Sequence, residues 1–337
     1  MGAYLVKRLL LIIPTLIGIT LVTFLVIHLT PGDPAELKIK KGEMGASSLV
    51  TKEMLEQTRK LYGLDKPLHV QYWIWVKRIV RLDFGSSFKD QRPVWDKVKE
   101  ALPITLLLNL ISIALIYLLA VPLGVFSAIK RRSALDNVIT VFLFVLYSLP
   151  SFWVAQELIT YLAGGDYLDI LPAYGLHSDG IEAFPRWGFY WIIDSTWHLL
   201  LPIFCLTYGG LAYLSRMERI GMLEVIRQDY IRTARAKGLS ERKVILKHAF
   251  RNSLIPILTL MAGLLPALLG GSVIIEQIFN IRGMGWLTFE AILNRDYPII
   301  MGVFTLSALL TLVGLLMSDL MYVLVDPRIS FEEAEGG

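Results

Sequence analysis

The amino-acid sequence predicts an all-α polytopic membrane protein with six transmembrane helices and a folded external loop after the first of them. The chain has 337 residues, of which 55% are hydrophobic and 18% are charged, whereas about a quarter of the residues in a typical soluble chain are charged. Its mean hydropathy is +0.56. The apolar residues form long continuous blocks and not helical stripes, which excludes a soluble enzyme with one buried core. Because Cys205 is the only cysteine, a disulfide scaffold is excluded as well.

Six apolar stretches are long enough to cross a membrane. A helix that crosses about 30 Å of hydrocarbon needs about 20 apolar residues, and a helix satisfies its own backbone polar groups in lipid. Lys7 and Arg8 precede the first stretch as they would in a secretory signal, but its apolar part is too long for one, so we predict an uncleaved anchor. Prolines in five of the stretches, among them Pro150, are expected to kink the helices, with hinge motion as a second use. The predicted spans are residues 9–29, 102–129, 138–163, 196–215, 253–275 and 299–325.

The distribution of Lys and Arg predicts that both termini lie in the cytoplasm, in a multi-pass protein of the cell's inner membrane. Short loops rich in Lys and Arg stay on the cytoplasmic side. Residues 1–8 and 130–132 carry only basic charges, and 216–252 carries ten bases against four acids. By contrast, 164–198 carries one base against five acids, and 276–298 carries two bases against three acids. These two segments are therefore predicted to be external.

The long segment 30–101 is predicted to be external and folded. It holds fourteen bases and ten acids, but at 72 residues it exceeds the length of about 60 residues within which the charge rule is informative. Residues 51–61 are predicted to form a short helix and 71–80 a second amphipathic one. The aromatic residues of the second, Tyr72, Trp73 and Trp75, are expected to anchor the loop at the headgroup level. The alternative is that these aromatic residues form a surface that binds a ligand.

Motifs for catalysis or for nucleotide binding do not occur in the sequence. It contains no G-x-x-x-x-G-K-[ST] phosphate loop, no H-E-x-x-H metal motif and no G-x-S-x-G nucleophile motif. We therefore expect a protein that is not an enzyme, binds no metal or cofactor itself and has no nucleic-acid partner. Any uphill transport must then be driven by another subunit or by an ion gradient, which leaves a gradient-driven secondary transporter as the alternative function.

Two acids within the predicted spans, Glu157 and Asp319, are the candidates for a gradient-driven path. A charge in lipid is costly and is often functional. Pairing with a neighbouring helix or reaching to the membrane surface is the interpretation we favour for Asp319. For Glu157 both interpretations stay open, and it is the one candidate residue for the substrate path.

The cytoplasmic segment 216–252 is the most informative part of the chain. Its sequence from Asp229 onward predicts two helices joined at Gly238. Asp229 suits the positive end of the first helix dipole, and Gly238 supplies the left-handed residue with which many helices end. Ser240 is a good N-cap, and Glu241 lies just inside the next helix.

The first of these two helices has the features of a docking element. It is too short and too polar to be stable alone, and the small side chains of Ala234 and Ala236 would let another body approach it closely. Basic residues surround it. The alternative is that these basic residues only set the orientation of the chain in the membrane. The order of helix, glycine and capped helix favours docking.

This segment resembles the "EAA" loop of ABC importer permeases, in the peptide/nickel branch that includes dipeptide and oligopeptide permeases. Arg232, Thr233 and Ala234 match the three-residue EAA element, and Gly238 matches the glycine that follows it. The sequence departs from the general pattern in having Arg and Thr at the first two positions and a late proline, Pro256. Both departures resemble the peptide/nickel branch. Further resemblances cover nearly the whole chain, with 164–198 longer than usual. They are P-G-D-P at 31–34, G-L-D-K-P at 63–67, D-F-G at 83–85, N-R-D-Y-P at 294–298 and D-P-R at 326–328.

The resemblance implies a type I ABC importer permease that forms half of a translocation path. It implies a coupling helix that docks in the ATPase, with Tyr230, Arg232, Thr233, Ala234, Arg235, Ala236, Lys237 and Gly238 as the docking residues. It also implies a second homologous permease subunit as the heterodimer partner, two ABC ATPase subunits that bind the ATP and Mg, and an external solute-binding protein. The branch handles peptides, nickel, glutathione-like compounds and oligosaccharides, and short peptides are the predicted cargo.

The expected organisation of the chain follows from the spans and the resemblance together. It comprises the N-terminal anchor and first transmembrane helix (1–29), the external loop (30–101), a five-helix transmembrane core (102–325) that contains the coupling loop 216–252, and a cytoplasmic tail (326–337).

Overall fold

The protein, represented by a computed structural model, is helical over most of the part of the chain that the structure describes. The described residues are 2–30, 32, 56–57, 59–60, 63–163, 165, 167–181, 188–254, 256–257, 260, 268 and 271–325. In chain order, the elements are α1 (Gly2–Leu29), α4 (Leu68–Ile79), α5 (Val94–Ile129), α6 (Ala134–Ser148), α7 (Ser151–Leu162), α8 (Phe189–Val225), α9 (Asp229–Ala236), α10 (Glu241–Lys243), the π-helix η2 (Val244–Ala249), α11 (Phe250–Ser253), α14 (Val273–Ile278), α15 (Met284–Asn294) and α16 (Tyr297–Val325).

Within the described residues, four helices are long and apolar enough to cross a membrane, and the pair α6 and α7 would make a fifth span. The four are α1, α5, α8 and α16, which confirms the first, second, fourth and sixth predicted spans as helices. The fifth, 253–275, lies largely outside the described residues, and so does the side chain of Asp319. The spanning helices extend beyond the predicted boundaries: α5 starts at Val94 and not at 102, and α8 runs on to Val225 and not to 215.

The third predicted span, 138–163, is not one continuous helix. Its two halves, α6 and α7, meet at an angle of 96°. Leu149 has an extended backbone, as expected for a residue before proline, and Pro150 has no amide to continue the helix. The hydroxyl of Tyr208 on α8 donates a 2.6 Å hydrogen bond to the carbonyl oxygen of Leu149. The predicted kink at Pro150 is therefore a full break, and α8 stabilises it.

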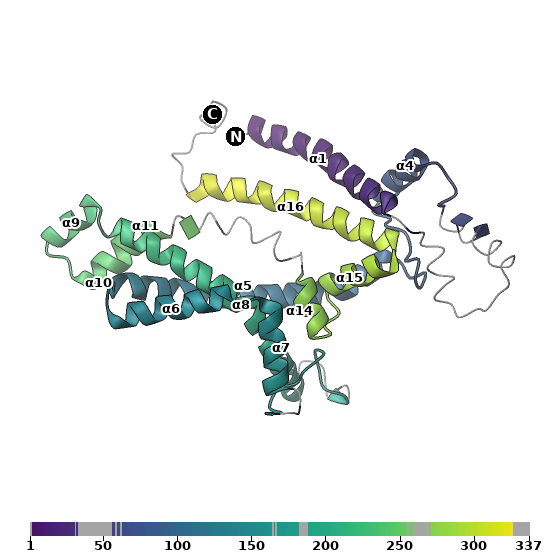
Figure 1. Cartoon of the computed structure of the whole chain (residues 1–337). Coiled ribbons are helices and arrows are strands. Elements are labelled where there is room, and N and C mark those ends of the chain that lie inside the picture. The colour runs from purple at the N-terminus through teal and green to yellow at the C-terminus, as the bar shows by residue number, and fades with distance from the viewer. Residues whose placement is uncertain are drawn as a thin grey trace.

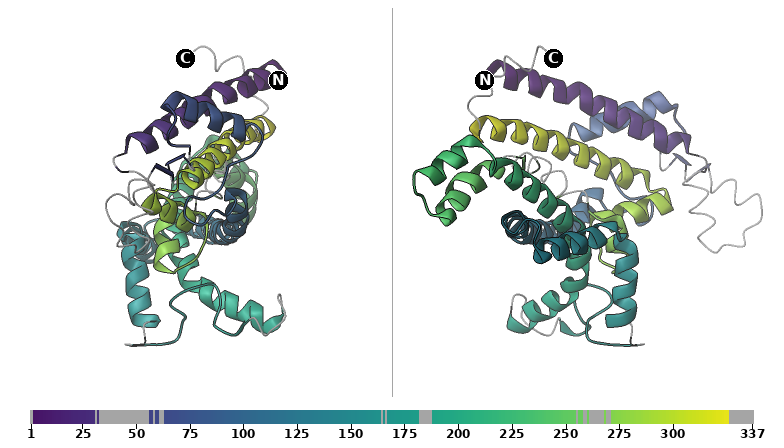
Figure 2. Two further views of the ribbon diagram at one scale, coloured as in Figure 1. Left: turned by 90° about the vertical axis from the view of Figure 1, so that its right-hand side faces the viewer. Right: turned by 60° about the vertical axis from the view of Figure 1, so that its left-hand side comes forward.

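The helices form two groups that lie side by side (Figures 1 and 2). In one group, α5 and α8 run parallel and pack along their length, with α6 beside them. In the other, α1 packs against α16 in the antiparallel sense. Figure 1 shows that the start of α1 and the end of α16 lie at the same end of the molecule as α9 and α10, whereas α4 and α15 lie at the opposite end.

The second of the two helices predicted in the long external segment is α4 (Leu68–Ile79). It packs on α1, where the Tyr72 hydroxyl lies 3.2 Å from Thr20 Oγ1 and Gln71 Oε1 lies 3.1 Å from His28 Nε2. Trp73 is exposed on α4, whereas Tyr72 and Trp75 are partly buried. Their role as headgroup anchors stays a prediction. Of the first predicted helix, 51–61, only residues 56–57 and 59–60 are described, and these are helical.

Candidate functional site: a coupling segment and an external cavity

The segment that follows α8 folds as the sequence predicts, into two helical pieces joined at a glycine. Asp229 is the first residue of α9, which ends at Ala236, and a second helical stretch begins at Glu241. The second stretch runs without a break from α10 through η2 into α11. Its middle six residues form a π-helix, a geometry that often marks functional positions in helices.

Gly238 joins the two pieces in the conformation that the sequence predicts. Its φ is +79°, and its amide donates a 2.9 Å hydrogen bond to the carbonyl of Arg235. A side chain at this position would meet no atom within 4 Å, so glycine is needed for its backbone conformation and not for space. Ser240 precedes α10 as predicted, but its side chain makes no capping hydrogen bond.

The inner face of α9 packs on the protein's own helices. Ile231 is fully buried and Ala234 is 7% exposed. Both belong to a cluster with residues of α5, α8 and η2: Val125, Ala128, Met222, Val244, Ile245 and Ala249. The expectation that the small side chain of Ala234 admits a partner is therefore wrong. It allows α9 to lie closely on its own bundle.

The outer face of α9 carries the remaining predicted docking residues. Tyr230, Arg232, Thr233, Arg235, Ala236, Lys237 and Gly238 are all exposed. Arg232 forms a 3.2 Å ion pair with Asp229, and the Tyr230 hydroxyl accepts a 2.8 Å hydrogen bond from Asn252 Nδ2.

A bidentate ion pair joins α9 to α10 across the glycine. Arg235 Nη2 and Nε lie 2.6 and 3.1 Å from the two carboxylate oxygens of Glu241. Its hydrogen bonds with Arg235 lower the pKa of Glu241, and the same contact raises the pKa of Arg235. A fork of this kind fixes direction as well as distance. The pair therefore holds the angle between the two helical pieces.

Two buried acids that the sequence did not single out lie near the coupling segment, where Asp136 joins α6 to α8 and Glu218 joins α8 to α11. Asp136, at the start of α6, is 2% exposed and accepts hydrogen bonds from Arg219 at 2.8 and 2.9 Å and from the Arg132 amide at 2.9 Å. Glu218 of α8 is fully buried and accepts a 2.8 Å hydrogen bond from Ser253 Oγ of α11. Ser133 caps α6 by accepting a hydrogen bond from the Asp136 amide, a local pattern that could have pointed to Asp136, whereas no local pattern marks Glu218.

Glu157, the candidate residue for the substrate path, lies on α7 and is half-buried. Among the described residues, none forms a hydrogen bond or an ion pair with its carboxylate. The structure does not bring Glu157 together with the residues of the coupling segment. Its role as a path residue stays a prediction.

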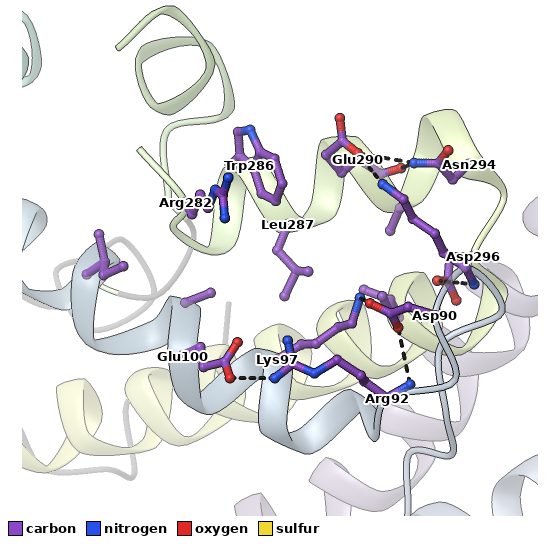
Figure 3. A pocket seen from close by; sticks show the side chains of 15 residues that line it. Asp90, Arg92, Lys97, Glu100, Arg282, Trp286, Leu287, Glu290, Asn294 and Asp296 are labelled. Atoms are coloured by element: carbon purple, nitrogen blue, oxygen red, sulfur yellow. Dashed lines mark hydrogen bonds and ion pairs between the residues drawn. The ribbon is translucent and has the colours of Figure 1, made fainter. Parts of the chain in front are cut away.

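At the opposite end of the molecule, a cavity of about 390 Å³ lies between α15, the start of α5 and the loop before it (Figure 3). Charged side chains of both signs line it, and its deeper wall is apolar. The lining residues with polar or aromatic side chains are Lys89, Asp90, Arg92, Lys97, Glu100, Arg282, Trp286, Glu290, Asn294 and Asp296.

Three of the sequence motifs meet beside this cavity. Asp296 of N-R-D-Y-P is buried and accepts hydrogen bonds from the Ser87 hydroxyl and from the amides of Phe88 and Lys89. Its neighbour Arg295 donates a 2.7 Å hydrogen bond to the carbonyl of Gly32 in P-G-D-P. The D-F-G turn precedes the same loop, and its Phe84 is buried in the core that includes the start of α5. These motifs join the external segment to the α15–α16 turn.

A buried carboxylate organises the start of α15. Glu276 accepts hydrogen bonds from Thr105 Oγ1 at 3.1 Å and from the Trp286 amide at 2.8 Å. Burial raises the pKa of Glu276, although these hydrogen bonds oppose the shift. Thr105 also accepts a 2.8 Å hydrogen bond from the Met284 amide. No local sequence pattern marks the contact between Glu276 and Thr105, because the two residues lie 171 positions apart.

A metal centre is absent from the described part of the chain, where no three His, Cys, Asp or Glu side chains are grouped closely enough to hold an ion. The arrangement is therefore one of packing and ion pairs: a stiff basic segment at one end and a charged cavity at the other.

Comparison with known proteins assigns the chain to a family. Residues 120–331 match the model of the binding-protein-dependent transport system inner membrane component, and residues 1–109 match the model of the N-terminal part of such components. The chain belongs to this family. The resemblance stated from the sequence motifs is thereby confirmed.

Curated relatives match along nearly the whole chain. The oligopeptide transport system permease protein AppB of Bacillus subtilis (strain 168) is 39% identical over 332 residues, which cover 98% of this chain and 100% of the relative. The dipeptide transport system permease protein DppB of Escherichia coli (strain K12) is 36% identical over 340 residues, or 97% and 98% of the two chains. The inner membrane ABC transporter permease protein YejB of Escherichia coli O157:H7 is 34% identical over 364 residues, or 98% and 100%.

The protein is thus an inner-membrane permease subunit of an ABC importer and not an enzyme. The family description also implies ATPase and solute-binding partners. The alternative of a gradient-driven secondary transporter is wrong, because the family and the curated relatives are components of binding-protein-dependent ABC systems.

Proposed function

We propose that this permease imports short peptides, as one half of a translocation path that a second homologous permease subunit completes. The relatives named for oligopeptides and dipeptides support a peptide cargo, since they match the chain over at least 97% of its length. The second subunit is proposed because the large exposed apolar surface of α5 and α6 suits contact with lipid and with another helical subunit.

The end of the molecule that carries α9 and both termini is proposed to face the cytoplasm. The basic residues gather there: the link 130–132 between α5 and α6 and the coupling segment both belong to it. The positive-inside rule places such an end in the cytoplasm. It follows that α4, α15 and the cavity face outward, toward the solute-binding protein.

Coupling to the ATPase is proposed to run through the outer face of α9. ATP and Mg would bind to the partner ATPases and not to this chain, and closure of the ATPase pair would move α9. The observation that carries this proposal is that α9 is fixed at three places. Ile231 and Ala234 anchor it to α5 and α8, and the Arg235–Glu241 fork fixes it to α10.

Because the stretch from α10 to α11 is continuous and joined to α8 through Ser253 and Glu218, a push on α9 would be passed to the membrane helices. A ligand or partner shifts a conformational equilibrium only through contacts that differ between the two states. A stiff segment keeps such a difference from being lost in local bending.

The substitution Gly238→Pro tests the coupling proposal. Proline requires φ near −65°, whereas Gly238 has φ of +79°, so the joint between α9 and α10 must rearrange. We expect membrane insertion to persist while ATP-driven peptide uptake is lost. Gly180→Pro is the matched control, since Gly180 has φ of +86° and open space around it but lies in the external segment. Unchanged uptake in the Gly238 variant, or equal loss in both, would contradict the proposal.

A further inference from the structure

The α15 wall of the external cavity presents three different side chains in a row. Arg282, Trp286 and Glu290 recur at intervals of four residues, which places them along one side of the helix and its entry. Figure 3 shows Arg282 and Trp286 at one end of the cavity and Glu290 with Asn294 at the other. Arg282 precedes the helix, which begins at Met284, so the row runs from the loop before α15 onto the helix itself.

The cation at one end of the row has no acidic partner among the described residues. Arg282 is exposed, and its guanidinium lies 5.7 Å from the centre of the Trp286 ring. A guanidinium over an aromatic face keeps its hydrogen-bond donors free at its edge. Its fork geometry suits a carboxylate.

Glu290, the acid at the other end of the row, accepts hydrogen bonds from the described residues through only one of its two carboxylate oxygens. Glu290 Oε2 forms an ion pair with Lys89 Nζ and accepts a hydrogen bond from Asn294 Nδ2, both at 3.2 Å, while Oε1 accepts no hydrogen bond from a described residue. The side chain of Glu290 is 31% exposed. The Oε1 atom is therefore available to one more cation.

The rest of the cavity offers no net charge to a ligand. On the opposite wall, Lys97 pairs with Asp90 at 2.6 Å, and Arg92 pairs with Glu100. The deeper wall is apolar and buried, and its residues are Ala101, Leu287, Ala291 and Ile299. The ligand that fits has a negative end, a positive end and an apolar middle.

We propose that the cavity binds the free peptide in an extended form, with its carboxylate at Arg282 and its ammonium group at Glu290. Trp286 then lies against the middle of the peptide, and a volume of about 390 Å³ is in the range of small-ligand sites. This inference rests on the proposed peptide import and gives it an entry site on this subunit.

The test uses the complete transporter in lipid nanodiscs without the solute-binding protein, and isothermal titration with the tripeptide Ala-Leu-Ala. The N-acetylated and C-amidated forms of the same peptide each lack one terminal charge. Glu290→Gln should weaken the binding of the free peptide about tenfold and leave that of the N-acetylated form unchanged. Arg282→Gln should likewise weaken the binding of the free peptide and leave that of the C-amidated form unchanged. Asp96→Asn is the control, because Asp96 lies in the first turn of α5 but does not line the cavity, and it should change neither.

Three results would overturn the inference: no binding of Ala-Leu-Ala to the wild-type transporter, equal weakening of all three peptide forms by one variant, or the same loss in Asp96→Asn. In a fourth result, Arg282→Gln or Glu290→Gln would lower the association of the solute-binding protein and leave the affinity for the free peptide unchanged. This result would assign the surface to the solute-binding protein. ATP-driven uptake by the wild-type transporter with its binding protein is measured in parallel. Failure of that uptake would refute the proposed function, whereas intact uptake with any of the four results refutes only the entry site.

Discussion

Replacement of Ile231 by alanine is expected to detach α9 from the membrane helices while the rest of the fold persists. Ile231 is fully buried, and Ile231 and Ala234 are the only buried residues of this eight-residue helix. A helix of that length is not stable alone. The substitution removes three carbon atoms, or about 2.4 kcal/mol of transfer free energy at ~0.8 kcal/mol per methylene group, and the cavity left behind adds to this. The equilibrium constant for docking of α9 on the membrane helices should therefore fall by a factor of about 50.

Hydrogen exchange read by mass spectrometry on the purified transporter measures this effect. The amides of residues 229–238 should exchange about 50-fold faster in Ile231→Ala, and peptide uptake should fall with ATPase subunits still bound. Ile220→Ala is the matched control, because Ile220 on the neighbouring α8 is 50% exposed. Unchanged protection of α9 in Ile231→Ala would refute the packing argument, and full uptake despite lost protection would refute the need for stiffness.

Two further substitutions test the ion pairs at the end of the molecule that carries α9. Glu241→Gln should loosen the joint of α9 and α10 by about 0.3–1 kcal/mol, read as faster exchange at 235–241. Since the pKa of Glu241 is lowered in the fold, the stabilisation is present above its unfolded-state pKa and is lost as the pH falls through the lowered value, so wild-type exchange should approach that of the variant only in acid. Asp136→Asn should lower the stability of the purified protein by roughly 2–4 kcal/mol, because it leaves Arg219 without its buried partner, and Asp136→Asn with Arg219→Gln should recover part of the loss. A thermal unfolding midpoint unchanged in the single variant would contradict this role.

The sequence predicted the elements that local chemistry determines. Gly238 was identified because a left-handed residue after a short polar helix has few other uses, and its φ of +79° bears this out. The apolar spans of α1, α5, α8 and α16 were identified by length alone. Motif matches likewise located N-R-D-Y-P and P-G-D-P, although the pattern gave no sign that Arg295 and Gly32 form a hydrogen bond.

What the sequence did not predict depends on contacts between distant segments. The burial of Ala234 could not be inferred, since α9 shows only two inward residues, too few for a helical pattern. The break of 96° at Pro150 is stabilised by the hydroxyl of Tyr208, which is 59 residues from its acceptor Leu149. Glu276 had been counted only as a loop charge, and its burial follows from Thr105 on α5. The cavity lining likewise comes from two distant stretches of the chain, 89–104 and 282–299.

Cross-linking from the outer face of α9 tests the central claim most directly. Cys205 is buried, and burial in a membrane helix keeps it from reagents, so an Arg232→Cys variant presents one accessible thiol on a side chain position that is 73% exposed. A thiol-directed cross-linker should join this cysteine to an ATPase subunit in the assembled transporter, and ATPase subunits should protect it from maleimide added on the cytoplasmic side. Labelling of the same cysteine by an impermeant maleimide added outside the cell, with no cross-link to the ATPase, would contradict the account.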